Sequence, residues 1–220
     1  DAAGSDAWRG VAAHAVAASL GPVPGPVHLN LPFREPLIGV ARDLPPRAGS
    51  DASFAAGSSL VDVPAELAGL ASRGRGVVLA GWGIDDSRAV TALAGRLGWP
   101  IVADPRSGIR SADGAVVLRH ADSVLRHAPT AARLRPNVVL RLGDPPASKV
   151  VNAWIASSGA LVVGVSPTGR TVDPDRVVVA QFAMQPSVAC TMVADAPVDE
   201  GWLSEWRSVT AIATEVLRSA

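Results

Sequence analysis

The stretch "NVVLRLGDPPASKVVNAWIAS", residues 137–157, joins a predicted strand to a predicted helix through a turn that contains two prolines. Valine and leucine dominate its first eight residues, and apolar residues recur at helical spacing after Ser148. A strand followed at once by a helix is the first half of a βαβ unit, which joins parallel strands. The stretch therefore predicts a parallel sheet.

The same alternation continues on both sides of this stretch. The chain predicts strands at 76–83, 100–104, 137–144, 160–166 and 176–181, and helices at 60–72, 85–98, 148–157, 186–194 and 200–218, with a loop at 105–114 and short helical stretches around 120–128. Such spacing indicates right-handed βαβ crossovers. We expect an α/β fold with a doubly wound parallel sheet of five or six strands.

Composition narrows the class of protein. Of 220 residues, 48% are hydrophobic and only 4% are aromatic, which favours a core of Val, Leu, Ile and Ala under helices on both faces of a sheet. The net charge is zero, so the sequence indicates no nucleic-acid partner. No apolar run is long enough to predict a membrane span. The single Cys190 predicts no internal disulfide, no metal site and a reducing, cytoplasmic compartment.

The first quarter of the chain follows a different pattern. An Ala-rich helix is predicted over 6–20, and "PVHLNL", residues 26–31, predicts a strand outside the main sheet. Residues 39–57 are rich in Pro, Gly, Ser and Ala with little periodicity, which is typical of a linker. We therefore expect a short N-terminal part at 1–38, a linker at 39–57, a central Rossmann-like domain at 58–195 and a final helix within 196–220.

Glycines follow the strand at 76–83, where a dinucleotide fingerprint would place Gly-x-Gly-x-x-Gly. Gly81 and Gly83 fit this pattern, but Asp86 occupies the third glycine position. Asp85 and Asp86 suit the N-cap and first turn of the following helix. The structural interpretation is therefore favoured over nucleotide binding.

Two cations mark a candidate anion site at the carboxyl ends of the strands. Lys149 is the only lysine of the chain and follows the turn "GDPPAS"; Arg170 follows the next strand. Ligands of open α/β sheets bind at this edge, so Lys149 and Arg170 could form an anion-binding pair, with Ser148 and backbone N–H groups helping. The alternative is two solvated cations on loops.

Other polar groups suggest structural roles. Asp104 and Arg106 predict a local turn pair, and Trp202 and Trp206 a packing face of the last helix. The four histidines, none of them at metal-ligand spacing, are interpreted as surface or capped residues: His14, His28, His120 and His127. We assign no catalytic residue, metal ligand or cofactor-binding residue to this chain.

"GPVHLNLPFREPL", residues 25–37, resembles the end of the pyrimidine-binding domain in the thiamine-diphosphate enzyme superfamily. Its "PFREPL" tail and "LGDPPASKVVNAW" are similar to the menaquinone-pathway synthases of that superfamily. The resemblance implies that 1–38 is the tail of the first domain and 58–195 the central, transhydrogenase-like domain. The final helix would lead toward a pyrophosphate domain.

For the parent enzyme, the resemblance implies addition of the succinyl unit of 2-oxoglutarate to isochorismate, with thiamine diphosphate and Mg²⁺ or Mn²⁺, in a homodimer or homotetramer. It carries Lys149 over as a contact to a substrate carboxylate. The activating glutamate and the Gly-Asp-Gly metal motif belong to other domains, so we expect this chain alone to bind no cofactor and to be inactive. Two alternatives stay open: the FAD-holding central domain of an acetohydroxyacid-synthase-like enzyme, and a stand-alone Rossmann-like module that binds a small anion.

Overall fold

A computed structural model describes residues 5–20, 25–31, 35, 38–39, 63–111, 116–169 and 172–219. The chain separates into two compact units, Asp1–Val61 and Asp62–Ala220. The first unit contains helix α1 (Ser5–Leu20), as predicted. The second unit contains the sheet and the candidate site.

All six strands of the second unit run parallel, in the order β3-β2-β1-β4-β5-β6. Their bounds are β1 (Gly76–Ala80), β2 (Ile101–Ala103), β3 (Val117–Leu118), β4 (Val138–Leu142), β5 (Leu161–Ser166) and β6 (Val178–Ala183). The chain proceeds outward from β1 to β3 and then returns to the other side of β1, as in a doubly wound fold. The predicted fold class is confirmed.

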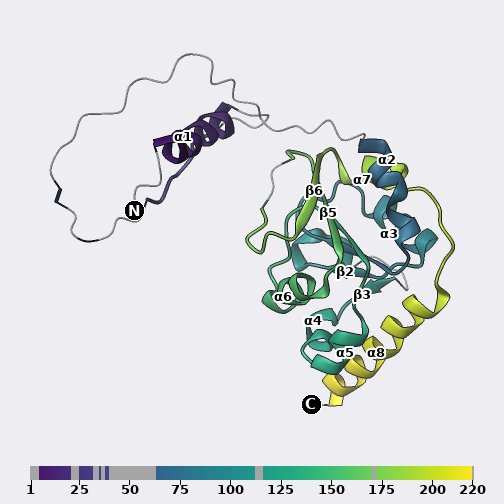
Figure 1. The fold of residues 1–220 in the computed structure, drawn as a ribbon. Coiled ribbons are helices and arrows are strands. Elements are labelled where there is room, and N and C mark those ends of the chain that lie inside the picture. Colours follow the sequence, from purple (N-terminus) through teal and green to yellow (C-terminus); the bar gives the residue numbers. More distant parts are fainter. Residues whose placement is uncertain are drawn as a thin grey trace. The chain divides into compact units, whose positions relative to one another are not determined.

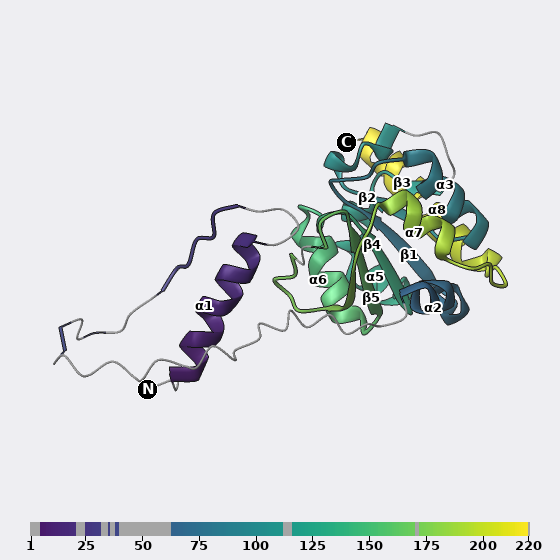
Figure 2. The ribbon, with the colours of Figure 1, turned by 90° about the horizontal axis from the view of Figure 1, so that it is seen from above.

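Helices cover both faces of this sheet, and Figures 1 and 2 show α6 on one side with α3 and α7 on the other. One core cluster joins the sheet to α2 (Val63–Ala68), α3 (Ser87–Leu97) and α7 (Pro186–Met192). The other joins it to α4 (Ala121–Leu125), α6 (Lys149–Ser158) and α8 (Glu200–Ser219). Short elements complete the unit: α5 (Ala128–Arg133), η1 (Gly69–Arg73), η2 (Pro105–Ser107) and η3 (Ile109–Ser111).

Period-two alternation divides each strand between the two clusters. Val138 belongs to the α3 side and Val139 to the α6 side, and both are fully buried. Every residue of β1 and β4 is buried, which explains why these strands read as continuous apolar runs. None of the described helices is long and apolar enough to cross a membrane.

The last helix supplies much of the aromatic packing on the α6 side. Trp206 makes edge-to-face contacts with Trp154 and Trp202, with ring centroids 5.6 and 5.9 Å apart. The indole nitrogen of Trp202 donates to the carbonyl of Gly76 at 2.8 Å, and the guanidinium of Arg75 lies over its ring. The predicted packing role of Trp202 and Trp206 is confirmed.

Two sequence-based expectations differ from the structure. Residues 25–31 have no regular secondary structure, so the strand predicted at 26–31 is wrong, although the segment lies outside the main sheet as expected. A strand needs a partner for its backbone groups, and no described residue pairs with this segment. Conversely, the sequence did not predict β3, which pairs with β2 and lies between the predicted loop at 105–114 and the predicted helical stretches around 120–128. It has only two residues, too few to give a pattern.

Backbones of the loops that leave β1 and β4 lie in direct contact. A Cβ atom added to Gly81 would lie 1.7 Å from the carbonyl oxygen of Asp144, and one added to Gly143 would lie 2.1 Å from that of Trp82. Two hydrogen bonds tie the loops together, from the Gly81 amide to Leu142 at 2.8 Å and from the Asp144 amide to Trp82 at 2.9 Å. Only glycine permits this approach.

We expect Gly81→Ala to destabilise the second unit by about 3 kcal/mol or more, because the new methyl group would overlap a backbone carbonyl that cannot rotate away. Urea unfolding followed by tryptophan fluorescence measures this change. The matched control is Gly95→Ala, at an exposed position of α3 with open space around it, which should stabilise by about 0.5–1 kcal/mol. A Gly81→Ala protein as stable as the parent would contradict the contact.

Candidate functional site

The candidate site lies at the carboxyl ends of β1 and β4, where the strand order reverses direction. Open α/β sheets bind their ligands at this switch point. Here the loops that leave β1 and β4 are in direct backbone contact at Gly81 and Asp144. Asp86 caps α3 by accepting hydrogen bonds from the amides of Arg88 and Ala89, as predicted.

The turn after β4, residues 143–148, is held by two side chains of the segment that follows β2. Asp104 accepts a hydrogen bond from the Ala147 amide at 2.6 Å, and Arg106 donates to the carbonyl of Pro145 at 2.9 Å. Asp104 and Arg106 also pair with each other at 2.9 Å, which confirms the predicted turn pair. The pair therefore has a second role, because it holds a turn some forty residues further along the chain.

Asp104 is buried, with 3% of its surface exposed. Burial raises the pKa of its carboxyl, but the hydrogen bonds from the Arg106 side chain and from the amides of Ala147 and Arg106 outweigh burial and hold the pKa below its usual range. The same carboxylate raises the pKa of the Arg106 guanidinium. Asp104 is thus charged at neutral pH, when it binds the turn.

Ser148, predicted as an anion ligand, is engaged in the protein itself. Its hydroxyl oxygen accepts a hydrogen bond from the Val151 amide at 3.1 Å and so caps α6. The same hydroxyl donates to the carboxylate of Asp122 on α4, and Asp122 in turn pairs with Arg126 at 3.0 Å. Ser148 therefore positions the start of α6.

Lys149 is the first residue of α6 and is exposed. Its ammonium group makes no hydrogen bond or ion pair with any described residue. A cation at a helix N-terminus lies against the positive end of the helix dipole, so local helix energetics disfavour it there. A position that violates a local rule without a structural gain is a candidate functional position. Arg170, the other predicted cation, lies outside the described residues, so its distance from Lys149 stays untested.

Arg141 is a charged residue near this edge to which the sequence interpretation gave no role. Arg141 lies within β4 and is 5% exposed, and burial lowers the pKa of its guanidinium against the opposing charges of Asp173 and Asp144. Its signal in the sequence was a charged residue inside a run predicted to be buried on both faces. Arg141 lines a pocket of about 210 Å³ beneath the β5–β6 connection.

The remaining titratable groups form no catalytic arrangement. Cys190 is buried in α7, and burial together with the charge of Asp85 raises the pKa of its thiol to about 12. The carboxylate of Asp85 accepts hydrogen bonds from the hydroxyl and the amide of Ser187. Burial raises the pKa of Asp85, but these hydrogen bonds outweigh burial and lower the pKa below its usual value. His127 bonds the Thr130 hydroxyl at 2.8 Å. The part of the chain that the structure describes holds no group of three acidic, His or Cys side chains suited to a metal ion.

Asp104→Asn should reduce the free energy of unfolding by about 1.5–3 kcal/mol at pH 7, because the amide replaces a charged acceptor with a group that cannot accept at both positions. A carboxyl whose pKa is lowered by folding stabilises above its unfolded pKa of about 3.9, and this contribution is lost as pH falls through the folded value. The difference from the parent should therefore shrink below about pH 4. Urea unfolding at several pH values measures it.

The control is Asp175→Asn, an exposed carboxylate for which the structure gives no hydrogen bond within the described part. It should change stability by less than about 0.5 kcal/mol at pH 7. Equal effects of the two substitutions would contradict the role of Asp104 in holding the turn.

Comparison with known proteins agrees with this geometry. The family model described as "Middle domain of thiamine pyrophosphate" matches residues 64–220. The chain is similar to three curated proteins that share the name 2-succinyl-5-enolpyruvyl-6-hydroxy-3-cyclohexene-1-carboxylate synthase. The protein of Geobacillus thermodenitrificans is 32% identical over 234 residues, covering 96% of this chain and 38% of the relative. The protein of Halorubrum lacusprofundi is 32% identical, and the match covers 94% of this chain and 39% of the relative. The protein of Listeria monocytogenes is also 32% identical, and the match covers 88% of this chain and 36% of the relative.

The chain spans less than two fifths of the length of these relatives. The matched segment coincides with the second unit, which contains the whole six-stranded sheet. Sequence, fold and family model agree, and the chain belongs to the family of middle domains of thiamine pyrophosphate enzymes.

Proposed function

We propose that this chain is the central part of a synthase that adds the succinyl unit of 2-oxoglutarate to isochorismate, as the resemblance to menaquinone-pathway enzymes implies. The name that these relatives share supports this assignment over the acetohydroxyacid-synthase-like alternative. In the whole protein the reaction would use thiamine diphosphate with Mg²⁺ or Mn²⁺. A dimer or tetramer and a cytoplasmic location are part of the same proposal.

We propose that the groups that bind thiamine diphosphate belong to other domains of the whole protein. At the switch point the loops that leave β1 and β4 are in backbone contact, and no metal-binding group is found among the described side chains. We therefore derive no step of the reaction through the cofactor here. The isolated chain is expected to be inactive.

Lys149 carries the proposed contribution of this domain. The turn before it is held by Asp104 and Arg106, and Ser148 caps the helix that it begins, so the backbone of Lys149 has a fixed position. Its ammonium group is exposed and, among the described residues, unpaired. A lysine presented in this way binds a carboxylate without first having to break another interaction. We assign it to a carboxylate of isochorismate.

Arg170 is proposed as a second cation, which binds acidic effectors more than substrate. It follows the last residue of β5 by four positions in the sequence. Loss of its charge should therefore change inhibition by acidic products of the pathway more than it changes turnover.

In the full-length enzyme we expect Lys149→Ala to reduce kcat/KM for isochorismate by about 10- to 150-fold, the loss of one charge-assisted hydrogen bond. Decarboxylation of 2-oxoglutarate should change little, because the proposal gives Lys149 no contact with that substrate. Steady-state kinetics with each substrate varied separately measures both values.

Two further variants sharpen this test. Lys149→Arg keeps the charge and should recover part of the loss, whereas Arg88→Ala removes an exposed cation of α3 and should have no effect. An equal loss for both substrates would indicate a folding defect, and full activity of Lys149→Ala toward isochorismate would refute the assignment.

A further inference from the structure

The start of α6 is held from outside the helix by Asp122, a residue of α4. The hydroxyl oxygen of Ser148 accepts from the Val151 amide at 3.1 Å, and its proton is donated to Oδ2 of Asp122. A hydroxyl group has one proton, so the bond to Asp122 determines where its lone pairs point and hence how the cap is oriented. Asp122 and Ser148 are 26 positions apart in the sequence. The cap of α6 therefore depends on a tertiary contact.

The second oxygen of Asp122 has a partner of its own. Oδ1 accepts a hydrogen bond from Nε of Arg126 at 3.0 Å, one turn further along α4. An exposed ion pair of this kind contributes little to stability. Its effect here is on orientation, because a carboxylate that is bonded through both oxygens keeps one of them directed at Ser148.

The two helices that carry these groups share one hydrophobic core. Three buried side chains of α4 and three of α6 belong to the same cluster: Ala121, Val124, Leu125, Val151, Trp154 and Ile155. A shift of α4 relative to α6 would open packed apolar surface, so the two helices keep a fixed spacing. The bond between Asp122 and Ser148 is thus supported by the core beneath it.

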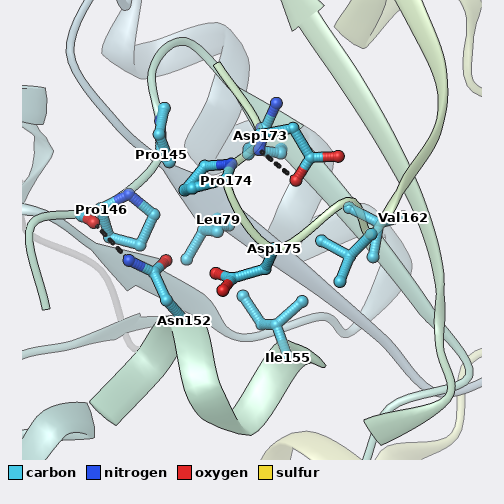
Figure 3. Close-up of a pocket in the computed structure, with 11 residues that line it drawn as sticks. Leu79, Pro145, Pro146, Asn152, Ile155, Val162, Asp173, Pro174 and Asp175 are labelled. Carbon is cyan, nitrogen blue, oxygen red and sulfur yellow. Dashed lines mark hydrogen bonds and ion pairs between the residues drawn. The ribbon is translucent and has the colours of Figure 1, made fainter. Parts of the chain in front are cut away.

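A second hydrogen bond holds the chain on the other side of Lys149. The side-chain amide of Asn152 donates to the carbonyl of Pro146 at 2.9 Å, as Figure 3 shows. Pro146 precedes Lys149 and Asn152 follows it, so the bond spans the residue that starts the helix. Together with the Ser148 cap, it gives the backbone of Lys149 a defined position.

The charge of Asp122 also matters to Lys149. The helix dipole disfavours a cation in the first turn of α6 and favours a carboxylate there. Asp122, bonded to the cap residue of α6, supplies that negative charge from a neighbouring helix. Its oxygens bond Ser148 and Arg126, and no ion pair joins it to Lys149 among the described residues. Asp122 therefore offsets the dipole and leaves the ammonium group of Lys149 available to a ligand.

We propose that Asp122 is a positioning residue of the whole enzyme, which acts through the Ser148 hydroxyl to hold Lys149 against a carboxylate of the substrate. This inference rests on the proposed function, because that function assigns the carboxylate contact to Lys149. Asp122 itself touches no substrate. Its loss leaves the ammonium group in place but makes its position less defined, which weakens binding of the substrate more than it slows the chemical step.

In the full-length enzyme, Asp122→Asn should raise KM for isochorismate by about three- to tenfold and change kcat by less than about twofold. The carboxamide has one acceptor oxygen for two donors, so either Ser148 or Arg126 loses its partner. In a Lys149→Ala background, Asp122→Asn should change KM by less than about twofold, because the side chain that it positions is already absent. Steady-state kinetics of the two single variants and the double variant measures this coupling.

Rescue and a matched control separate positioning from a general loss of stability. Ser148→Ala should raise KM for isochorismate as Asp122→Asn does, whereas Ser148→Thr keeps the hydroxyl and should recover most of the loss. The control is Asp199→Asn. One oxygen of Asp199 accepts from the Trp202 amide in the first turn of α8, and the other pairs with Nε of Arg75 at 3.1 Å. This cap lies beside the amino end of β1, the opposite edge of the sheet, so its loss should leave KM unchanged.

Hydrogen exchange of the 220-residue chain gives a readout that needs no enzyme activity. The Val151 amide should exchange at least about fivefold faster in Asp122→Asn than in the parent chain, and at the parent rate in Asp199→Asn. Unchanged exchange of Val151 in Asp122→Asn would overturn the inference.

The kinetic outcomes distinguish this inference from the proposed function. Full use of isochorismate by Lys149→Ala would refute the proposed function and the inference with it. A loss in Lys149→Ala without a loss in Asp122→Asn, or fully additive losses in the double variant, would overturn the positioning role alone.

Discussion

The close approach of the two loops that leave β1 and β4 determines the geometry of the whole carboxyl edge. Gly81 and Gly143 allow the backbones to touch, and the amides of both loops bond across the contact. This contact lies at the switch point, where many doubly wound folds bind a nucleotide. It also anchors the first residues of the turn that leads to α6.

Further hydrogen bonds hold that turn to the neighbouring elements. Asp104 binds the Ala147 amide, Arg106 binds the Pro145 carbonyl and Asn152 binds the Pro146 carbonyl. The turn therefore separates two cationic positions, each with a different environment. Lys149 begins α6 and is exposed, whereas Arg141 lies within β4 and is buried beside Asp173.

Local patterns in the sequence were sufficient for most of the fold. The apolar runs of β1 and β4 are buried on both faces, and Asp86 caps α3, so strand and helix positions followed from residues near each other in the chain. The strand predicted at 26–31 had the right residue types but no partner among the described residues, and pairing is not a local property.

The candidate site was less predictable for the same reason. Asp104 and Arg106 were recognised as a pair because they are two residues apart, but their bonds to the turn after β4 span about forty residues, and no local pattern records them. Ser148 was expected to face a ligand, whereas its hydroxyl caps α6 and reaches Asp122. Arg141 is a charged residue inside a strand that was predicted to be buried. The conflict between its charge and its predicted burial is visible in the sequence alone.

The central claim is that the turn after β4 is a rigid platform, and native-state amide hydrogen exchange tests it most directly. The Asp144 and Ala147 amides lie outside every strand and helix, yet they donate to the Trp82 carbonyl and to the buried Asp104 carboxylate. We predict that both exchange as slowly, within about tenfold, as the amides of Val139 and Leu140 in β4, which open only with the whole unit. Exchange of Asp144 and Ala147 at the rate of an unprotected loop would contradict the account.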